Sequence, residues 1–193
     1  LLDMYIRADA HEVLIDFEEL GLIELIVEKG DDAFDGLPDG IKANPEAMAE
    51  AIENNMRKTI IDENPVNPKY YDRMSELLDA LIVERREKAI GYQDYLEQIK
   101  ALARKVVKPG GGSSAYPASM DTPAKQALYD NLDNDELLAT KVDTAIRYTK
   151  KADWIGDRIK EREVALAVRE ETASYDVNLE EILAIAKNQK EYQ

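Results

Sequence analysis

The residue types that most often carry out covalent or metal chemistry are scarce in this chain of 193 residues. It contains no cysteine, which excludes a thiol nucleophile, a disulfide framework and a cysteine-based zinc site. His11 is the only histidine, so a histidine metal cluster is excluded and a Ser-His-Asp hydrolase is disfavoured. We therefore expect no catalytic residue and no metal ligand, and we interpret His11 as a surface or helix-packing side chain.

Two glycine-rich segments have residue types that could bind an ion or a phosphate group. Residues 30–40 gather glycine, proline and aspartate, but they lack the Asp-x-Asp-x-Asp-Gly order of a calcium-binding loop, so an acidic linker is expected. Residues 110–114 read Gly-Gly-Gly-Ser-Ser, yet a phosphate-binding P-loop requires a glycine followed by lysine, and this chain has none. The pattern predicts a flexible Gly/Ser-rich loop over about residues 108–121.

The charge of the chain limits the partners that it can bind. The formal net charge is −15, and residues 1–50 alone hold 14 acidic and 3 basic side chains. Such a chain repels phosphate as a whole, so nucleic acid could bind only through a local basic face.

Two segments supply local positive charge. Residues 98–108 contain four basic and no acidic side chains, and residues 147–169 contain seven basic and four acidic ones, with aromatic residues between them. Basic residues near an aromatic ring can hold phosphate or pack on a partner protein. The alternative is that these are solubilising charges and that the tryptophan is a core anchor. The candidates for partner or DNA binding are Lys100, Arg104, Lys105, Lys150, Lys151, Trp154, Arg158, Lys160 and Arg162.

Arg162 stands out among these candidates because of its spacing. It follows Ile159 by three residues and precedes Leu166 by four, which places it on an apolar stripe of the expected helix. An arginine in that position should pair with an acid from another helix, cover the helix with its aliphatic stem, or face a partner.

The clearest helical pattern, over residues 67–82, is the element around which we expect the others to pack. Asn67 can cap the first turn and Pro68 suits the first helical position. Apolar and aromatic residues then recur at steps of one, three and four, and include Leu77 and Leu78. We expect this helix to continue to Gly91, and we expect Leu78→Asp to unfold the domain.

The remaining sequence has helical periodicity and no convincing alternation typical of β-strands. The prediction is an all-α fold, an irregular multi-helix bundle of about eight helices with the flexible Gly/Ser-rich loop. We divide it into a helical segment with an acidic linker, residues 1–43, and a helical domain, residues 44–193. No apolar run is long enough to span a membrane and no signal peptide is recognisable, so a cytoplasmic location is expected.

The stretch Asn67-Pro68-Lys69-Tyr70-Tyr71-Asp72-Arg73-Met74-Ser75-Glu76-Leu77-Leu78-Asp79-Ala80-Leu81-Ile82 resembles a signature of the C-terminal region of the R subunit (HsdR) of type I restriction enzymes. Further pieces resemble the same family in the same order. They are residues 16–27, 92–96, 127–132, 153–154 with 160–164, and 188–192.

This resemblance implies a fragment of an ATP-dependent DNA-translocating endonuclease subunit that works with methyltransferase (M) and specificity (S) subunits on DNA. ATP and magnesium belong to the parent protein, a type I site-specific deoxyribonuclease, whose nuclease and motor domains precede this region. The fragment lacks both the Walker lysine and an acidic residue two positions before any lysine, as the nuclease motif requires. The expected function is a non-catalytic docking module with an accessory contact to DNA; the alternative is an internal scaffold that supports the motor domains and has no external partner.

Overall fold

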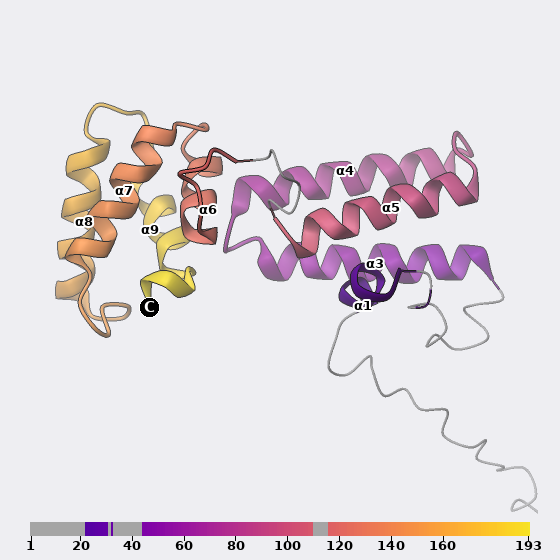
Figure 1. Ribbon diagram of the computed structural model, residues 1–193, viewed down its shortest axis with the longest axis horizontal. Coiled ribbons are helices and arrows are strands. Elements are labelled where there is room, and N and C mark those ends of the chain that lie inside the picture. Colours follow the sequence, from indigo (N-terminus) through magenta and orange to yellow (C-terminus); the bar gives the residue numbers. More distant parts are fainter. Residues whose placement is uncertain (1–21, 31, 33–43, 110–115) are drawn as a thin grey trace, which may run out of the picture.

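The computed structural model describes residues 22–30, 32, 44–109 and 116–193, and within these ranges the chain is all-helical. This confirms the predicted all-α multi-helix fold (Figure 1). The elements are α1 Leu22–Lys29, α3 Pro45–Glu63, α4 Pro68–Arg86, α5 Tyr92–Val107, α6 Pro123–Asn131, α7 Glu136–Thr149, α8 Arg158–Thr172, α9 Leu179–Lys187 and the 3₁₀ turn η2 Lys190–Tyr192. His11, the acidic linker over residues 30–40 except for residues 30 and 32, and the glycine run 110–114 lie outside the described residues.

Cap-then-proline pairs begin three of the helices. The Asn44 side chain accepts hydrogen bonds from the second and third helical amides of α3, and Asn67 accepts one from the Tyr70 amide at the start of α4. Thr122 does the same for α6. Each cap is followed by a proline, whose missing N–H costs nothing at a first helical position. The sequence therefore determines where these helices begin.

The helices form two lobes, each with its own apolar core (Figure 1). The first lobe comprises α1, α3, α4 and α5, and its core includes Ile52, Leu78 and Tyr95. The second lobe comprises α6 to α9 with η2, and its core includes Leu128 and Trp154. The cores thus divide the chain between α5 and α6. The acidic linker predicts a boundary near residue 43, and α1, which precedes this linker, packs against α3 and α5.

A buried ion pair lies between the helices of the first lobe. The Arg85 guanidinium donates to the Glu53 carboxylate at 2.8 and 3.2 Å, and both side chains are under 10% exposed. The Tyr95 hydroxyl donates to the same carboxylate at 3.1 Å, while its ring lies 5.5 Å from the guanidinium carbon. Burial opposes the charge on Arg85, but hydrogen bonds to Glu53 and Glu46 raise its pKa overall.

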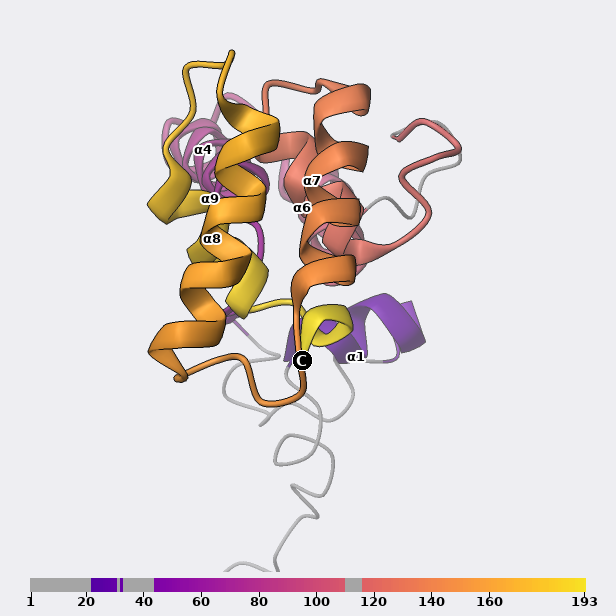
Figure 2. The same cartoon turned by 90° about the vertical axis from the view of Figure 1, so that its left-hand side faces the viewer.

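The second lobe is closed by the last residues of the chain. The Trp154 indole N–H donates to the Tyr192 carbonyl oxygen at 2.6 Å, and the Tyr192 hydroxyl donates to Asp143 at 2.6 Å. Arg147 completes the cluster through a 2.8 Å ion pair with Asp143. Burial, followed by the hydrogen bond to Asp143, raises the pKa of Tyr192. Figure 2 shows η2 crossing the foot of this helical bundle, where these contacts form.

Several local expectations differ from the structure. Helix α4 ends at Arg86 instead of Gly91, because Lys88 adopts a left-handed conformation with φ of 55°. Leu77 was expected to be buried with Leu78 but is 42% exposed, since only one side of α4 faces the other helices. Met120, which falls within the predicted loop, is a core residue of the second lobe.

Candidate functional site

The structure places the basic candidates of residues 150–160 mostly in internal contacts. Trp154 is 1% exposed, so its ring is unavailable for stacking on a partner and is the core anchor of the second lobe. Lys150 donates to the Gln193 carbonyl oxygen, and Lys151 pairs with Glu163 at 2.6 Å. Lys160 donates to the Ala152 carbonyl oxygen at 2.8 Å. These side chains help to hold the turn between α7 and α8.

The outer side of α8 combines cations with exposed apolar side chains. We call the set Arg158, Ile159, Arg162, Leu166 and Arg169 the α8 face. On a helix of 3.6 residues per turn these five residues fall within a sector of about 100°. All five are exposed, Ile159 by 74% and Leu166 by 47%, and none of the three arginines forms an ion pair with a described residue. Of the three roles considered for Arg162, pairing with an acid of another described helix is not observed.

The core side of α8 carries a different set of residues. Its buried side chains are Val164, Val168 and Thr172, whereas Ile159 and Leu166, which form the apolar stripe beside Arg162, are exposed. Two apolar stripes therefore run along this helix, and only one of them packs into the second lobe. Figures 1 and 2 show α8 with α7 at the end of the molecule farthest from the first lobe.

Acidic side chains of α8 bind the protein itself. Asp157 accepts from the Lys160 and Ile159 amides, and these hydrogen bonds hold its pKa below the usual range. Glu161 accepts hydrogen bonds from the Lys187 side chain and from the Gly156 amide. Both bonds lower the pKa of Glu161, and the bond from Lys187 contributes most. Because these acids are engaged by their own lobe, the outward charge of the α8 face is positive, with Glu170 exposed at its edge.

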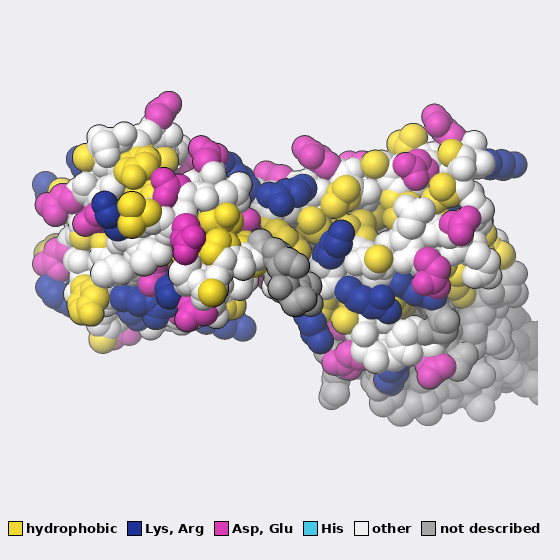
Figure 3. All heavy atoms as spheres, turned by 45° about the horizontal axis from the view of Figure 1, so that its top comes forward, with side chains coloured by type: hydrophobic (Ala, Val, Ile, Leu, Met, Phe, Trp, Pro, Cys, Tyr) yellow, Lys and Arg dark blue, Asp and Glu magenta, His cyan; other side chains and the backbone are white. Residues whose placement is uncertain are grey.

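The first basic segment, residues 98–108, has one buried basic side chain and three exposed ones. Lys100 is buried and pairs with Glu97 at 3.2 Å, so it does not belong to an outward basic surface. Arg104, Lys105 and Lys108 are exposed and form no ion pair with a described residue. Figure 3 shows several Lys and Arg side chains over α4 and α5 beside the junction of the two lobes.

Arg73 on α4 joins these cations, and the sequence analysis missed it because it lies about thirty residues earlier in the chain. The Tyr70 hydroxyl donates to the Lys105 carbonyl oxygen at 2.8 Å, which places this turn of α4 against the end of α5. Burial raises the pKa of both Tyr70 and Tyr116, and the Arg73 charge counters part of each rise. We call Arg73, Arg104, Lys105 and Lys108 the α4–α5 basic surface.

A buried polar network joins the lobes. The Asn67 amide donates to the Asp130 carboxylate at 2.7 Å, and the Tyr116 hydroxyl donates to the same oxygen at 2.6 Å. The Asn131 amide donates to the Asn67 side-chain oxygen at 2.8 Å. Asn67 is thus both the cap of α4 and the central residue of the junction.

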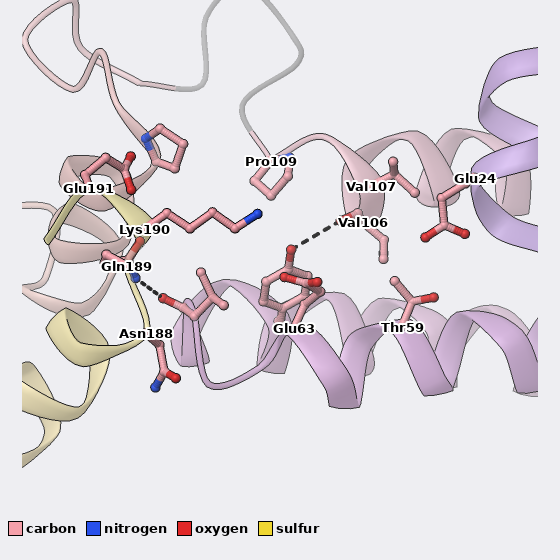
Figure 4. Close-up of a pocket in the computed structure, with 13 residues that line it drawn as sticks. Glu24, Thr59, Glu63, Val106, Val107, Pro109, Asn188, Gln189, Lys190 and Glu191 are labelled. Carbon is pink, nitrogen blue, oxygen red and sulfur yellow. Dashed lines mark hydrogen bonds between the residues drawn. The ribbon is translucent and has the colours of Figure 1, made fainter. Parts of the chain in front are cut away.

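A cavity of about 600 Å³ opens beside this junction and is lined from both lobes (Figure 4). The Lys190 side chain extends into it from η2, toward Pro109. Glu24 reaches it from α1, and one oxygen of this carboxylate is buried without a hydrogen-bond partner. Among the described residues no three His, Cys, Asp or Glu side chains are grouped so that they could hold a metal ion.

In the described part of the chain no helix has both the length and the apolar character needed to cross a membrane. Comparisons with protein-family models, with curated proteins and with solved structures found no match to this chain.

Proposed function

We propose that this chain is a helical docking module of a cytoplasmic type I restriction R subunit, and that it attaches that subunit to the methyltransferase core through the α8 face. The observation that carries the proposal is the second apolar stripe of α8, which does not pack into the second lobe. A helix that packs one stripe into its own lobe and leaves a second one, rich in arginine and aliphatic residues, in solvent has a surface suited to a protein partner.

The chemistry of the α8 face supports a protein partner of a definite kind. Arginine is enriched at the centres of protein interfaces, where its planar guanidinium binds carboxylates with two hydrogen bonds. Ile159 and Leu166 would supply the apolar contact that a docked surface excludes from water. The complementary surface should therefore be acidic with an apolar centre.

The identity of the partner follows from the resemblance of residues 67–82 to the R-subunit signature. On that basis the partner is the assembly of M and S subunits. The reaction itself, with its ATP and magnesium, would belong to the domains of the parent protein that precede this region.

Size-exclusion chromatography with light scattering of the chain mixed with a methyltransferase–specificity core, without DNA, tests the proposal. The wild-type chain should co-elute with the core, and Arg162→Glu with Leu166→Glu should abolish co-elution. The matched control is Arg104→Glu with Ala101→Glu, which places two acids on an exposed part of α5 and should leave co-elution intact.

The alternative is an internal scaffold that supports the motor domains. It is favoured by the internal contacts of Lys150, Lys151 and Lys160, which show that much of the basic charge stabilises this fold alone. If the R subunit containing these α8 substitutions still joins the core normally, docking through α8 is refuted and the scaffold is the better description.

A further inference from the structure

We infer that the α4–α5 basic surface binds the phosphate backbone of duplex DNA. It lies in the other lobe from the α8 face and uses different residues, so the inference does not depend on docking through α8. Three features of this surface favour a phosphate ligand: its cations form no ion pair with a described residue, its α5 part has no exposed large apolar side chain, and two packed helices hold it in place.

The first feature is that the cations are available. Arg73, Arg104, Lys105 and Lys108 are all exposed, and none forms an ion pair with a described residue, although the chain carries 40 acidic side chains against 25 basic ones. By contrast, Arg57 and Lys69 of the same lobe bind Asp79 and Asp133, each at 2.6 Å. The protein as a whole has a net charge of −15, so these four neighbouring cations, unpaired among the described residues, create a locally positive surface on an acidic protein.

The second feature is the composition of the surface on α5. Arg104, Lys105 and Lys108 follow one another on the outer side of the helix, and the exposed residue between them and the preceding turn is Ala101. They have no exposed large apolar neighbour on α5, unlike the arginines of α8. Protein interfaces need apolar contacts at their centre, whereas a phosphate backbone is held by long, flexible cations alone. On α4 the exposed Leu77 follows Arg73 by four residues, so it is the composition of the α5 part of the surface that favours phosphate over an acidic protein.

The third feature is that two helices hold the cations in place. The hydrogen bond from the Tyr70 hydroxyl to the Lys105 carbonyl joins α4 to α5 at this point, and the Tyr71 hydroxyl donates to the Val106 carbonyl beside it. Of the nearby acids, Asp130 is buried in the junction, and Glu63 and Glu24 line the cavity, which none of the four cations lines. Glu97 pairs with Lys100, and Asp72 accepts a hydrogen bond from the Asn64 side-chain amide. Glu76, three residues after Arg73, is exposed and lies at the edge of the surface.

Fluorescence anisotropy of a labelled 20-base-pair duplex, titrated with the 193-residue chain at several salt concentrations, tests this inference. Binding should weaken steeply between about 50 and 200 mM KCl, because each neutralised phosphate contributes a slope of roughly −0.9 to the plot of log K against log salt. The triple variant Arg73→Gln, Arg104→Gln, Lys105→Gln should make this slope shallower by about 2 to 3 and lower the affinity at least tenfold in 50 mM KCl.

The matched control is Arg158→Gln, Arg162→Gln, Arg169→Gln, which removes the same charge from the α8 face. It should leave most of the affinity and the slope intact. Equal losses in the two triple variants would indicate a bulk charge effect and overturn the assignment, as would the absence of salt-dependent binding by the wild-type chain at 50 mM KCl. Because the docking assay contains no DNA and the anisotropy assay contains no M or S subunit, either proposal can fail while the other stands.

Discussion

The two lobes reach stability by different means. The first lobe packs three helices of 16 to 19 residues side by side and buries an ion pair, Arg85 with Glu53, between them. In the second lobe the helices have 9 to 15 residues, and a contact between Trp154 and Tyr192 closes the core. Long helices bury much apolar surface through one continuous stripe. Short ones depend on a few large side chains whose loss no neighbour can compensate.

Their surfaces differ in the same way. The second lobe exposes arginine together with isoleucine and leucine on α8, whereas the first lobe exposes three cations of α5 without large apolar neighbours on that helix. One chain thus carries two positively charged surfaces whose compositions favour different classes of partner.

The largest effect should come from Trp154→Ala, which removes the main anchor of the second core. We expect a loss of about 4–5 kcal/mol in the free energy of unfolding, since a fully buried ring and its hydrogen bond are both lost. Urea denaturation followed by far-UV circular dichroism measures it. Trp154→Phe keeps much of the volume and should cost less; equal losses would show that packing is not the cause.

In the first lobe the corresponding test is Glu53→Gln, which leaves the buried Arg85 charge with the exposed Glu46 carboxylate as its remaining ion-pair partner. The expected loss is about 3 kcal/mol. The control Arg57→Met breaks the exposed pair with Asp79 and should cost no more than about 1 kcal/mol. Trp154, the only tryptophan, reports the second lobe in both variants by fluorescence. An unchanged fluorescence midpoint in Glu53→Gln would establish that the lobes unfold separately.

The junction should respond to Asn67→Ala with a loss of about 2 kcal/mol, because a helix cap and the hydrogen bond to buried Asp130 disappear together. We also expect the transitions seen by circular dichroism and by fluorescence to move apart, since coincident transitions require the lobes to unfold as one unit. Coincident transitions in this variant would mean that the other contacts between α4 and α6 couple the lobes without Asn67.

The smallest effect should come from the α8 face. Replacing Arg158, Arg162 and Arg169 by glutamine should change the stability of the chain by no more than about 0.5 kcal/mol, because none of them packs in the core. Thermal and urea unfolding both measure this. A loss above 2 kcal/mol would show that the arginines serve the fold, and it would remove the physical basis for docking through α8.

Much of the architecture could be predicted from the sequence. The cap Asn67 and the following Pro68 correctly predicted the start of α4. Caps of the same kind stand before α3, α6 and α9, where Asn44, Thr122 and Asn178 accept from the first-turn amides. These signals act within one turn of the helix, so they do not depend on tertiary contacts. At α7 two neighbouring residues could act as the cap, and the structure uses Asp135, because Asn134 takes a left-handed conformation.

What the sequence could not determine is which of two stripes faces inward. Helix α8 carries one stripe with Ile159 and Leu166 and another with Val164 and Val168, and helical periodicity fits both. Only the neighbouring helices select the second. The α4–α5 basic surface was predicted only in part for a similar reason. The sequence pattern indicated Arg104 and Lys105, but Arg73 comes near them only because α4 packs against α5, and a local sequence pattern does not contain that contact.

The bond between Trp154 and the Tyr192 carbonyl also sets an order of events during synthesis. Helices α1 to α5 contain every residue of the first core, so that lobe can condense while later residues are still being added. The second core is complete only when residue 192 has left the ribosome, because the buried Tyr192 is one of its residues and supplies the acceptor for Trp154. The two lobes can therefore complete their cores at different times, the first well before the second.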